Sequence, residues 1–309
     1  MDFTLTDDER AVTEAAAQVA GAADPWSALA EGGWLDILLE EERGLGYLGL
    51  VAEALGAAGV AVPLAGTAVV WPTLFGGSAG ARRVGVADSP QEFQLPPPKG
   101  NGGPEAADGL LCEDGIGAEA VVVLLDGTAE IHEAFTVEAI GGLEGDGLAV
   151  IRLEGPAVDR CKDPDLVAEA RRRAAALTAA EMAGAIDRIA TMTAAYVAER
   201  QQFGRPISAF QAVAHGAARL ATLAQAATWS ARLACTSADP SDTSAAKGWI
   251  SAASVEAAAL AHQLHGAIGF TEEYGLQRLS KRLRTLRFAF GDDRFHHRAL
   301  GRSLMEDRG

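Results

Sequence analysis

The chain has 309 residues, of which 49% are hydrophobic, and it carries a formal net charge of −16 with a sequence pI near 4.8. This length and hydrophobic content allow a substantial buried core in one to three structural units. The strong negative charge argues against a general nucleic-acid binder, because nucleic-acid phosphates would be repelled.

The three cysteines, Cys112, Cys161 and Cys235, lie far apart and form no CxxC pair. We therefore expect neither a disulfide framework nor a metal site, and we expect each thiol to be a small buried hydrophobe. The acidic N-terminus has no apolar signal core, and no run of about 18 apolar residues occurs that could span a membrane. These features predict a cytoplasmic protein without a membrane partner.

The first region, residues 1–78, is predicted to be a helical domain. Thr6 and Glu9 have the spacing of a capping box, which satisfies free amide donors at a helix start. Apolar residues then recur at helical intervals, and two further helices are predicted over 33–42 and 48–55.

The second region, residues 79–160, is predicted to be a small β domain, barrel-like in form. Three short β-branched runs bounded by Gly, Asp and Pro predict strands over 84–87, 121–125 and 148–153. The Pro- and Gly-rich stretch 95–104 predicts a loop.

The third region, residues 161–309, is predicted to be a C-terminal antiparallel four-helix bundle, because long helical segments are joined by short breaks. The predicted helices span 168–200, 206–236, 244–266, 274–286 and 293–305. The chain as a whole is thus expected to be mainly α with a small β domain.

Two local patterns have ordinary explanations. Residues 44–49 match G-x-G-x-x-G, but a charged helix end precedes them instead of the strand that a dinucleotide site requires, so coincidence is favoured. Adjacent His296 and His297 would point about 100° apart on a helix and cannot share a metal, which favours an exposed helix face.

The segment 278–302 holds eight basic residues and only two acidic ones. One interpretation is a solvated helix surface. The other is a patch that meets an anion, such as a nucleotide phosphate or an acidic partner subunit.

Two motifs lie in the third region. The first runs from Arg200 to Gln211 and reads RQQFGRPISAFQ; the second follows Lys247 and runs from Gln263 to Tyr274 as QLHGAIGFTEEY. In this order and spacing they resemble the paired signatures in the C-terminal bundle of acyl-CoA dehydrogenases. The helix–β–helix plan and the N-terminal L-T-x-x-E are similar too, so the resemblance spans most of the chain, with shortened N-terminal and β regions.

The first motif also has its own physical logic. An arginine at a helix end followed by a Phe-Gly turn offers a fork of donors and lets a pyrophosphate approach the backbone closely. The resemblance implies that Arg200 reaches across a subunit interface to the FAD of a neighbouring chain, with Phe203 nearby and Gln211 in support. It implies that Gln263 and Gly266 lie beside the ADP part of the same FAD. The alternatives are a surface salt bridge for Arg200 and core packing for Phe203 and Phe210.

The family's catalytic base is missing from both positions where it is found. In these enzymes a glutamate takes the α-proton of the thioester while the β-hydride goes to the flavin. Most members carry it in a turn after the second signature, where this chain has Phe290, and a minority near the start of the first bundle helix, where it has Ala174. A T-E-P-x-x-G-S-D-like flavin-contacting segment is not found in 80–157, and Ala267 replaces a usual glycine. The ADP-side elements are thus present and the flavin-side elements are not.

The resemblance implies a heteromeric α2β2 enzyme, because some family members, including enzymes acting on CoA thioesters of sterol side chains, pair a full-length catalytic subunit with a shorter one. In the leading hypothesis this chain is the shorter subunit, with the acyl-CoA mainly on the partner and electron-transfer flavoprotein as a candidate electron acceptor. A second hypothesis is a self-sufficient homomeric dehydrogenase whose base is Asp292 or Asp293. A third is a non-catalytic scaffold with the same fold.

Overall fold

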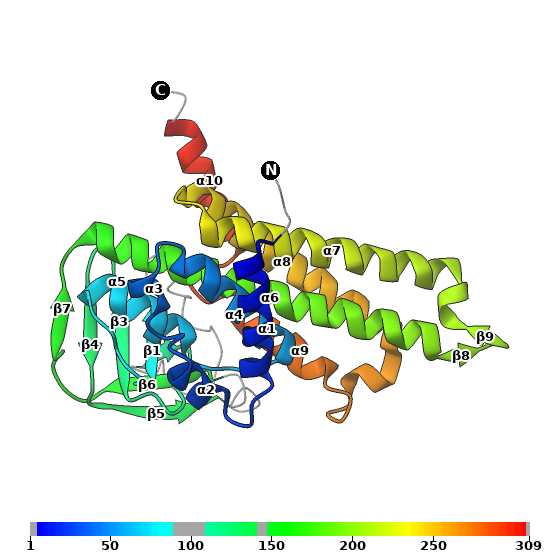
Figure 1. Ribbon diagram of the computed structural model, residues 1–309, viewed down its shortest axis with the longest axis horizontal. Helices are drawn as coiled ribbons and strands as arrows, with labels where there is room; N and C mark the ends of the chain where they lie inside the picture. The colour runs from blue at the N-terminus through cyan, green and yellow to red at the C-terminus, as the bar shows by residue number, and fades with distance from the viewer. Residues whose placement is uncertain (1–4, 89–108, 141–146, 307–309) are drawn as a thin grey trace, which may run out of the picture. The chain divides into compact units, whose positions relative to one another are not determined.

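The computed structural model describes residues 5–88, 109–140 and 147–306 (Figure 1). The chain forms two compact units that interleave along the sequence. The first comprises Met1–Ala28, Arg43–Val60 and Ala175–Gly309, and the second comprises Leu29–Glu42 and Ala61–Ala174. The division into domains 1–78, 79–160 and 161–309 stays a prediction, and the loop predicted over 95–104 lies outside the described residues.

The N-terminal helix α1 (Asp7–Ala20) begins at the predicted capping box. The amide of Thr6 donates to the Glu9 carboxylate at 2.8 Å, and the amide of Glu9 donates to the Thr6 hydroxyl at 3.3 Å. Helix α4 (Gly44–Ala58) packs against α1 and ends at Gly59, which adopts a left-handed φ of 66°. The helix predicted over 48–55 is therefore confirmed and is longer at both ends.

The helix predicted over 33–42 is wrong. The structure instead has α2 (Pro25–Glu31), a turn, and the short α3 (Ile37–Glu40). Gly33 takes a φ of 73°, which a right-handed helix does not contain, and this breaks the continuity that the apolar spacing indicated.

The second unit holds two small sheets. The four-stranded sheet has the order β1-β3-β4-β7, in which β1 and β3 are parallel and the other pairs are antiparallel. The three-stranded antiparallel sheet has the order β2-β6-β5. The strands are β1 (Val84–Asp88), β2 (Leu110–Cys112), β3 (Ala120–Leu124), β4 (Ala129–His132), β5 (Phe135–Ala139), β6 (Ala149–Leu153) and β7 (Asp159–Cys161).

The three predicted strands correspond to β1, β3 and β6. The sequence patterns did not indicate the other four strands. Strands β2, β4 and β7 have only three or four residues, and β5 is largely exposed and lacks a buried apolar run. A π-helical turn, η1 (Gly66–Val70), and α5 (Trp71–Phe75) also belong to this unit. Gly66 permits η1 to approach β1, since a Cβ there would lie 1.9 Å from the carbonyl oxygen of Val84.

The helical C-terminal region confirms the predicted helices to within a few residues (Figure 1). They are α6 (Pro164–Glu199), α7 (Gln211–Thr236), α8 (Pro240–His265), α9 (Leu276–Leu286) and α10 (Asp293–Glu306). A small hairpin of β8 (Gln201–Gln202) and β9 (Arg205–Pro206) and a 3-10 turn, η4 (Ile207–Ala209), connect α6 to α7. A second 3-10 turn, η5 (Gly266–Phe270), follows α8. Helix α7 begins five residues later than predicted because the hairpin and η4 occupy 206–210.

The glycines of the G-x-G-x-x-G match lie inside α4, not in a phosphate-binding turn. A Cβ at Gly49 would lie 2.9 Å from the sulfur of Cys235, and one at Gly46 would lie 3.2 Å from a methyl carbon of Thr236. Here the glycines allow α4 and α7 to pack closely, which is a structural role and agrees with coincidence.

The structure also bears on the cysteines and on membrane-spanning helices. Cys112, Cys161 and Cys235 are all buried thiols, as predicted. None of the described helices combines the length and the apolar character that a membrane crossing requires.

Candidate functional site

The connection between α6 and α7 carries the first sequence motif. Arg200 directly follows α6; its amide donates to the carbonyl of Tyr196 at 2.9 Å, and its carbonyl accepts from the amide of Ile207 at 2.8 Å. Phe203 and Gly204 form the tip of the β8–β9 hairpin with φ angles of 54° and 78°. Two successive left-handed residues are the geometry of a tight two-residue hairpin turn.

The side chains at this tip are presented to solvent. Arg200 is exposed and makes no ion pair with any residue that the structure describes. Phe203 is 90% exposed, so its alternative role in the core is wrong. Its ring meets that of Phe210 edge-on at 5.9 Å, and the Arg205 guanidinium lies 4.3 Å from the Phe210 ring centre. The tip therefore offers an aromatic face and cations.

The residues of the second motif come to the same end of the bundle. Tyr196, in the last turn of α6, stacks on His265, the last residue of α8, with ring centres 4.6 Å apart. Near the start of α7, a Cβ at Gly216 would lie 3.4 Å from the side chains of Leu260 and Leu264 in α8. The end of α6, the start of α7 and the end of α8 therefore lie together.

All five residues predicted to contact FAD are exposed at this end. Arg200 follows α6, Phe203 forms the hairpin tip, Gln211 begins α7, Gln263 lies in the last turn of α8, and Gly266 ends α8 with a φ of 65°. The structure thus brings to one end of one unit residues that are up to 66 positions apart in the sequence (266 − 200).

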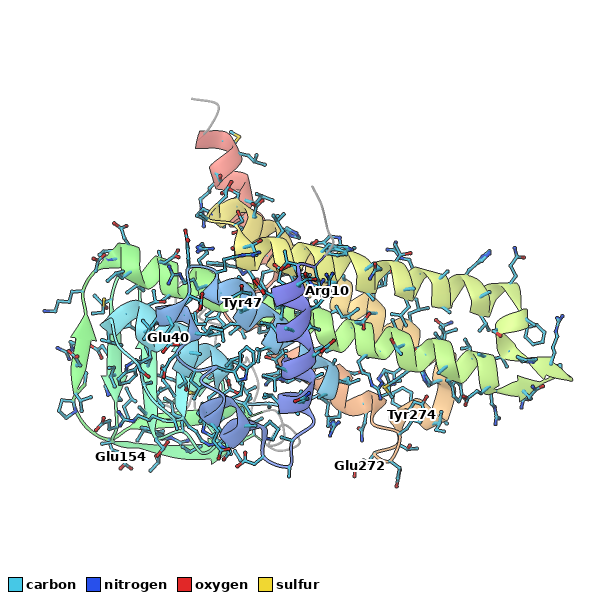
Figure 2. All side chains as sticks on the ribbon, viewed as in Figure 1. Arg10, Glu40, Tyr47, Glu154, Glu272 and Tyr274 are labelled. Atoms are coloured by element: carbon cyan, nitrogen blue, oxygen red, sulfur yellow. The ribbon has the colours of Figure 1, made fainter. Side chains whose placement is uncertain are left out.

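A hydrogen-bonded network that was not predicted from the sequence supports this end of the bundle. The carbonyl of Ala261 accepts from His265 Nδ1 at 2.8 Å, which leaves Nε2 to accept from the Tyr274 hydroxyl at 3.1 Å. Figure 2 labels Tyr274. Burial lowers the pKa of His265, in keeping with a neutral ring. Both residues belong to the second motif, for which the resemblance implies roles only at Gln263 and Gly266. The network fixes the turn that contains Gly266.

The turn that carries the base in most family members is built differently here. Phe290 occupies the expected glutamate position, is only 3% exposed and has a left-handed φ of 52°; Gly291 follows with a φ of 103°. Left-handed φ is uncommon for a bulky side chain and persists where surrounding contacts enforce it.

Two buried side chains enforce this conformation. The fully buried ammonium of Lys247 donates to the carbonyls of Gly291 at 2.9 Å and Arg287 at 3.1 Å, and to the hydroxyl of Ser251 at 3.1 Å. His296 Nε2 donates to the carbonyl of Phe290 at 3.0 Å. The turn is therefore anchored from α8 and from α10.

The interpretation of His296 and His297 as an exposed helix face is wrong for His296, which is 4% exposed. Burial, together with the nearby charge of Lys247, lowers the pKa of His296 to about 3. The ring is thus neutral at physiological pH, consistent with its role as a donor to one carbonyl.

The two alternative bases have structural partners. The Asp292 carboxylate accepts from the amide of Phe295 at 2.8 Å and so caps the start of α10. Asp293 pairs with Arg287 at 2.7 Å; burial raises its pKa, but Arg287 outweighs burial and the pKa is lowered. Ala174, the second family position, is fully buried within α6. None of these three positions offers an unengaged carboxylate.

The arginines of the basic segment 278–302 have different environments, some buried against internal partners and some exposed to solvent. Arg282 is 2% exposed and pairs with Glu181 at 2.7 Å, and Arg278 donates to the carbonyl of Ala58 at 3.0 Å. Arg284, Arg294 and Arg298 are exposed. Part of the positive charge is therefore structural, and part faces outward.

Comparison with known proteins shows what the helical region is similar to. Residues 167–305 match the acyl-CoA dehydrogenase C-terminal domain. The acyl-CoA dehydrogenase IpdE2 of Mycobacterium tuberculosis (strain ATCC 25618 / H37Rv) is 38% identical over 122 residues, which are 40% of this chain and 37% of that protein. This chain thus aligns with little more than a third of that relative's length. The acyl-CoA dehydrogenase family is FAD-dependent.

Solved structures match nearly the whole chain. The Tcur3481–Tcur3483 steroid ACAD variant superposes with a TM-score of 0.76 at 21% identity, covering 99% of both chains. The ChsE4–ChsE5 complex from Mycobacterium tuberculosis superposes with a TM-score of 0.75 at 22% identity, again covering 99% of both chains. Residues 167–305 of this chain therefore match the acyl-CoA dehydrogenase C-terminal domain, and the chain has the acyl-CoA dehydrogenase fold.

Proposed function

We propose that this chain is a subunit of an FAD-dependent acyl-CoA dehydrogenase, and that it supplies ADP-side contacts to an FAD whose flavin ring lies chiefly on a catalytic partner subunit. The observation that carries this proposal is an asymmetry within one unit. The five candidate cofactor residues lie exposed at one end of the bundle, while the turn that bears the family's base presents the buried Phe290.

The residues present fit the ADP half of the cofactor. Arg200 is an exposed guanidinium without an ion-pair partner among the described residues, as a pyrophosphate contact requires. The left-handed turn at Phe203 and Gly204 exposes backbone next to it. Gln263 offers an amide, and Gly266 has no side chain to obstruct a close approach. When bound, FAD accepts the hydride in this family's reaction; the part of this chain is to bind and orient it.

The missing base implies a partner that carries one. Phe290 cannot accept the α-proton, and Asp292 and Asp293 are held by the α10 cap and by Arg287. The acyl-CoA and the carboxylate would then lie mainly on the partner, in an α2β2 heterotetramer that acts in the cytoplasm and passes electrons to an electron-transfer flavoprotein.

The names of the relatives support this assembly and suggest a substrate class. One matched structure is described as a complex of two different chains, ChsE4 and ChsE5, and another as a steroid ACAD with two named components. We infer that the acyl-CoA is the thioester of a steroid-derived acyl chain.

The test is to purify the chain from its native source with any partner and to count FAD per chain. Arg200→Ala should lower the FAD content of the assembled complex roughly 10-fold or more, since a charge-assisted hydrogen bond is lost. Arg200→Lys should have an intermediate effect, because lysine keeps the charge without the fork.

Two outcomes would contradict the proposal. A lone chain that binds stoichiometric FAD and turns over substrate would support the homomeric enzyme. An Arg200→Ala complex with unchanged FAD content would support the non-catalytic scaffold.

A further inference from the structure

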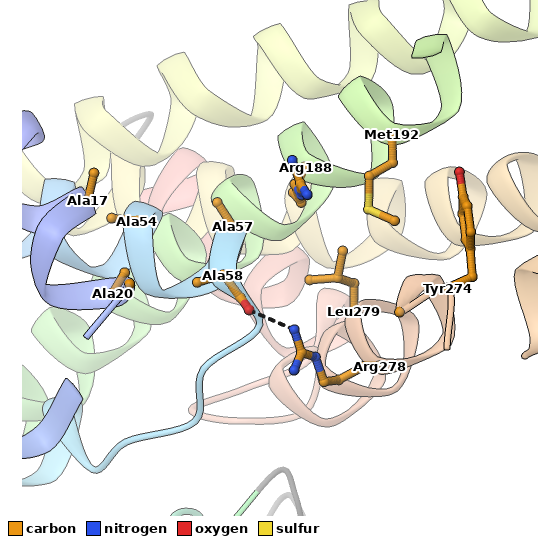
Figure 3. Close-up of a pocket in the computed structure, with 12 residues that line it drawn as sticks. Ala17, Ala20, Ala54, Ala57, Ala58, Arg188, Met192, Tyr274, Arg278 and Leu279 are labelled. Carbon is orange, nitrogen blue, oxygen red and sulfur yellow. Dashed lines mark hydrogen bonds between the residues drawn. The ribbon is translucent and has the colours of Figure 1, made fainter. Parts of the chain in front are cut away.

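A cavity of about 410 Å³ opens among α1, α4, α6 and α9, and all the residues that line it belong to the first unit (Figure 3). This volume lies in the range of small-molecule binding sites. None of the five candidate FAD residues lines the cavity. It is therefore a feature separate from the proposed cofactor contacts.

Small side chains create the space. Ala17 and Ala20 of α1 and Ala54 and Ala57 of α4 form one wall, and Met192 of α6 lies on the opposite side (Figure 3). Methyl groups and a thioether are apolar, and a thioether adapts its shape to what it contacts. The body of a ligand held here would accordingly be apolar.

Two guanidinium groups border the same space. Arg278 of α9 is anchored by one hydrogen bond to the carbonyl of Ala58 at 3.0 Å. Arg188 of α6 is exposed and has no ion pair or side-chain hydrogen bond with any residue in the described part of the chain. No aspartate or glutamate is among the described residues that line the cavity. Guanidinium forks pair with carboxylates and phosphates, so the charged part of the ligand would be an oxyanion.

Tyr274 also lines the cavity, and a hydrogen bond to His265 holds its side chain in place. Its hydroxyl donates to His265, which is itself fixed by the carbonyl of Ala261. The ring offers a rigid aromatic surface, and the engaged hydroxyl retains its acceptor lone pairs.

We propose that this cavity binds a small organic oxyanion with an apolar body, the anion between Arg188 and Arg278 and the body against the alanine wall and Tyr274. The chemistry is shared by hydrophobic carboxylates and hydrophobic phosphate esters. The proposal does not depend on the role in FAD binding, because the two sites share none of the residues assigned to ligand contact.

Calorimetric titration of the full chain, in the complex with which it purifies, tests this with three matched probes: naphthoate, naphthyl phosphate and the uncharged naphthamide. At least one anion should bind, and the amide should bind roughly 10-fold or more weakly, because it lacks the charge that the guanidiniums pair with. Binding of naphthoate alone would identify a carboxylate site, and binding of naphthyl phosphate alone a phosphate-ester site.

Three substitutions locate the binding. Arg188→Gln should weaken anion binding roughly 10-fold or more by loss of a charge-assisted contact, and Ala57→Leu should abolish it by filling the cavity. Arg284→Gln is the matched control, because Arg284 is an exposed arginine on α9 that does not line the cavity. Absence of binding by both anions, equal binding of the amide, or unchanged binding in Arg188→Gln would overturn the proposal. Arg188 is exposed, so this variant remains informative if Ala57→Leu does not fold.

Discussion

Gly56 of α4 lies so close to α6 that a Cβ at this position would be 1.9 Å from the carbonyl oxygen of Glu181. The approach is reciprocal: a Cβ at Gly184 of α6 would be 1.9 Å from the carbonyl oxygen of Glu53 in α4. Two helices that belong to distant parts of the sequence therefore cross backbone to backbone, and only glycine fits on either side.

This crossing predicts a large effect from a small substitution. Gly56→Ala should destabilise the fold by about 3 kcal/mol, because the backbone of α4 must move away from α6. Chemical denaturation measures the change in the free energy of unfolding. Gly301→Ala is the matched control: Gly301 is exposed within α10 and a Cβ there meets nothing within 4 Å. The control should be neutral or stabilising by up to about 1 kcal/mol. Equal effects of the two substitutions would show that the helices do not cross as described.

The turn around Phe290 should depend on Lys247. Lys247→Met removes the donor to the carbonyls of Arg287 and Gly291 and should destabilise the fold by about 1–3 kcal/mol. The desolvation cost of the buried ammonium disappears in this variant and offsets part of that loss. Hydrogen exchange of the 288–292 amides should accelerate more than exchange in α7. Lys281→Met, at an exposed position on α9, serves as the control. Unchanged exchange in the turn would mean that the ammonium does not hold it.

His296 should make stability depend on pH. Burial and Lys247 lower its folded-state pKa to about 3, while the unfolded chain keeps the ordinary value of about 6.5. Between these values the unfolded state binds the extra proton, so the contribution of the neutral ring is complete above about pH 6.5 and decreases by about 1.4 kcal/mol per unit as pH falls towards 3. Urea denaturation of the wild-type chain and of His296→Gln, compared from pH 7 to about pH 4.5, measures the contribution of His296 to the pH dependence of the free energy of unfolding. If His296→Gln leaves the pH dependence of stability unchanged, other titratable groups cause that dependence.

Asp292 and Asp293 should be dispensable for turnover. Asp293→Asn loses the pair with Arg287, which is worth about 0.5–1 kcal/mol at a partly exposed site, and Asp292→Asn keeps a side chain that caps helices well. Activity of the purified complex should stay within about 2-fold in both variants, since general base catalysis, if lost, would cost about 100-fold or more. A drop of that size in either variant would restore the homomeric hypothesis.

Long sequence patterns predicted secondary structure more reliably than short ones. The long alanine-rich segments and the Thr6–Glu9 capping box specified helices by local geometry alone, and the structure confirms them. Short strands such as β2 and β7 have too few residues for a periodic pattern to be recognised, and a neighbouring strand stabilises them by pairing. The apolar spacing wrongly predicts a helix through Gly33, because such spacing carries no information about the sign of φ.

Some features of the candidate site could be predicted from the sequence, and others depend on tertiary packing. The sequence by itself determined the identity of the exposed cofactor candidates and the absence of a glutamate at Phe290 and Ala174, because motif residues and missing residues can be counted. Only the tertiary structure decided that His296 is buried, that Lys247 and His296 hold the Phe290 turn, and that alanines, Arg188 and Arg278 enclose a cavity. These features arise between helices far apart in the chain, and the distance between two such helices is set by the packing of all the side chains between them, which no local pattern records.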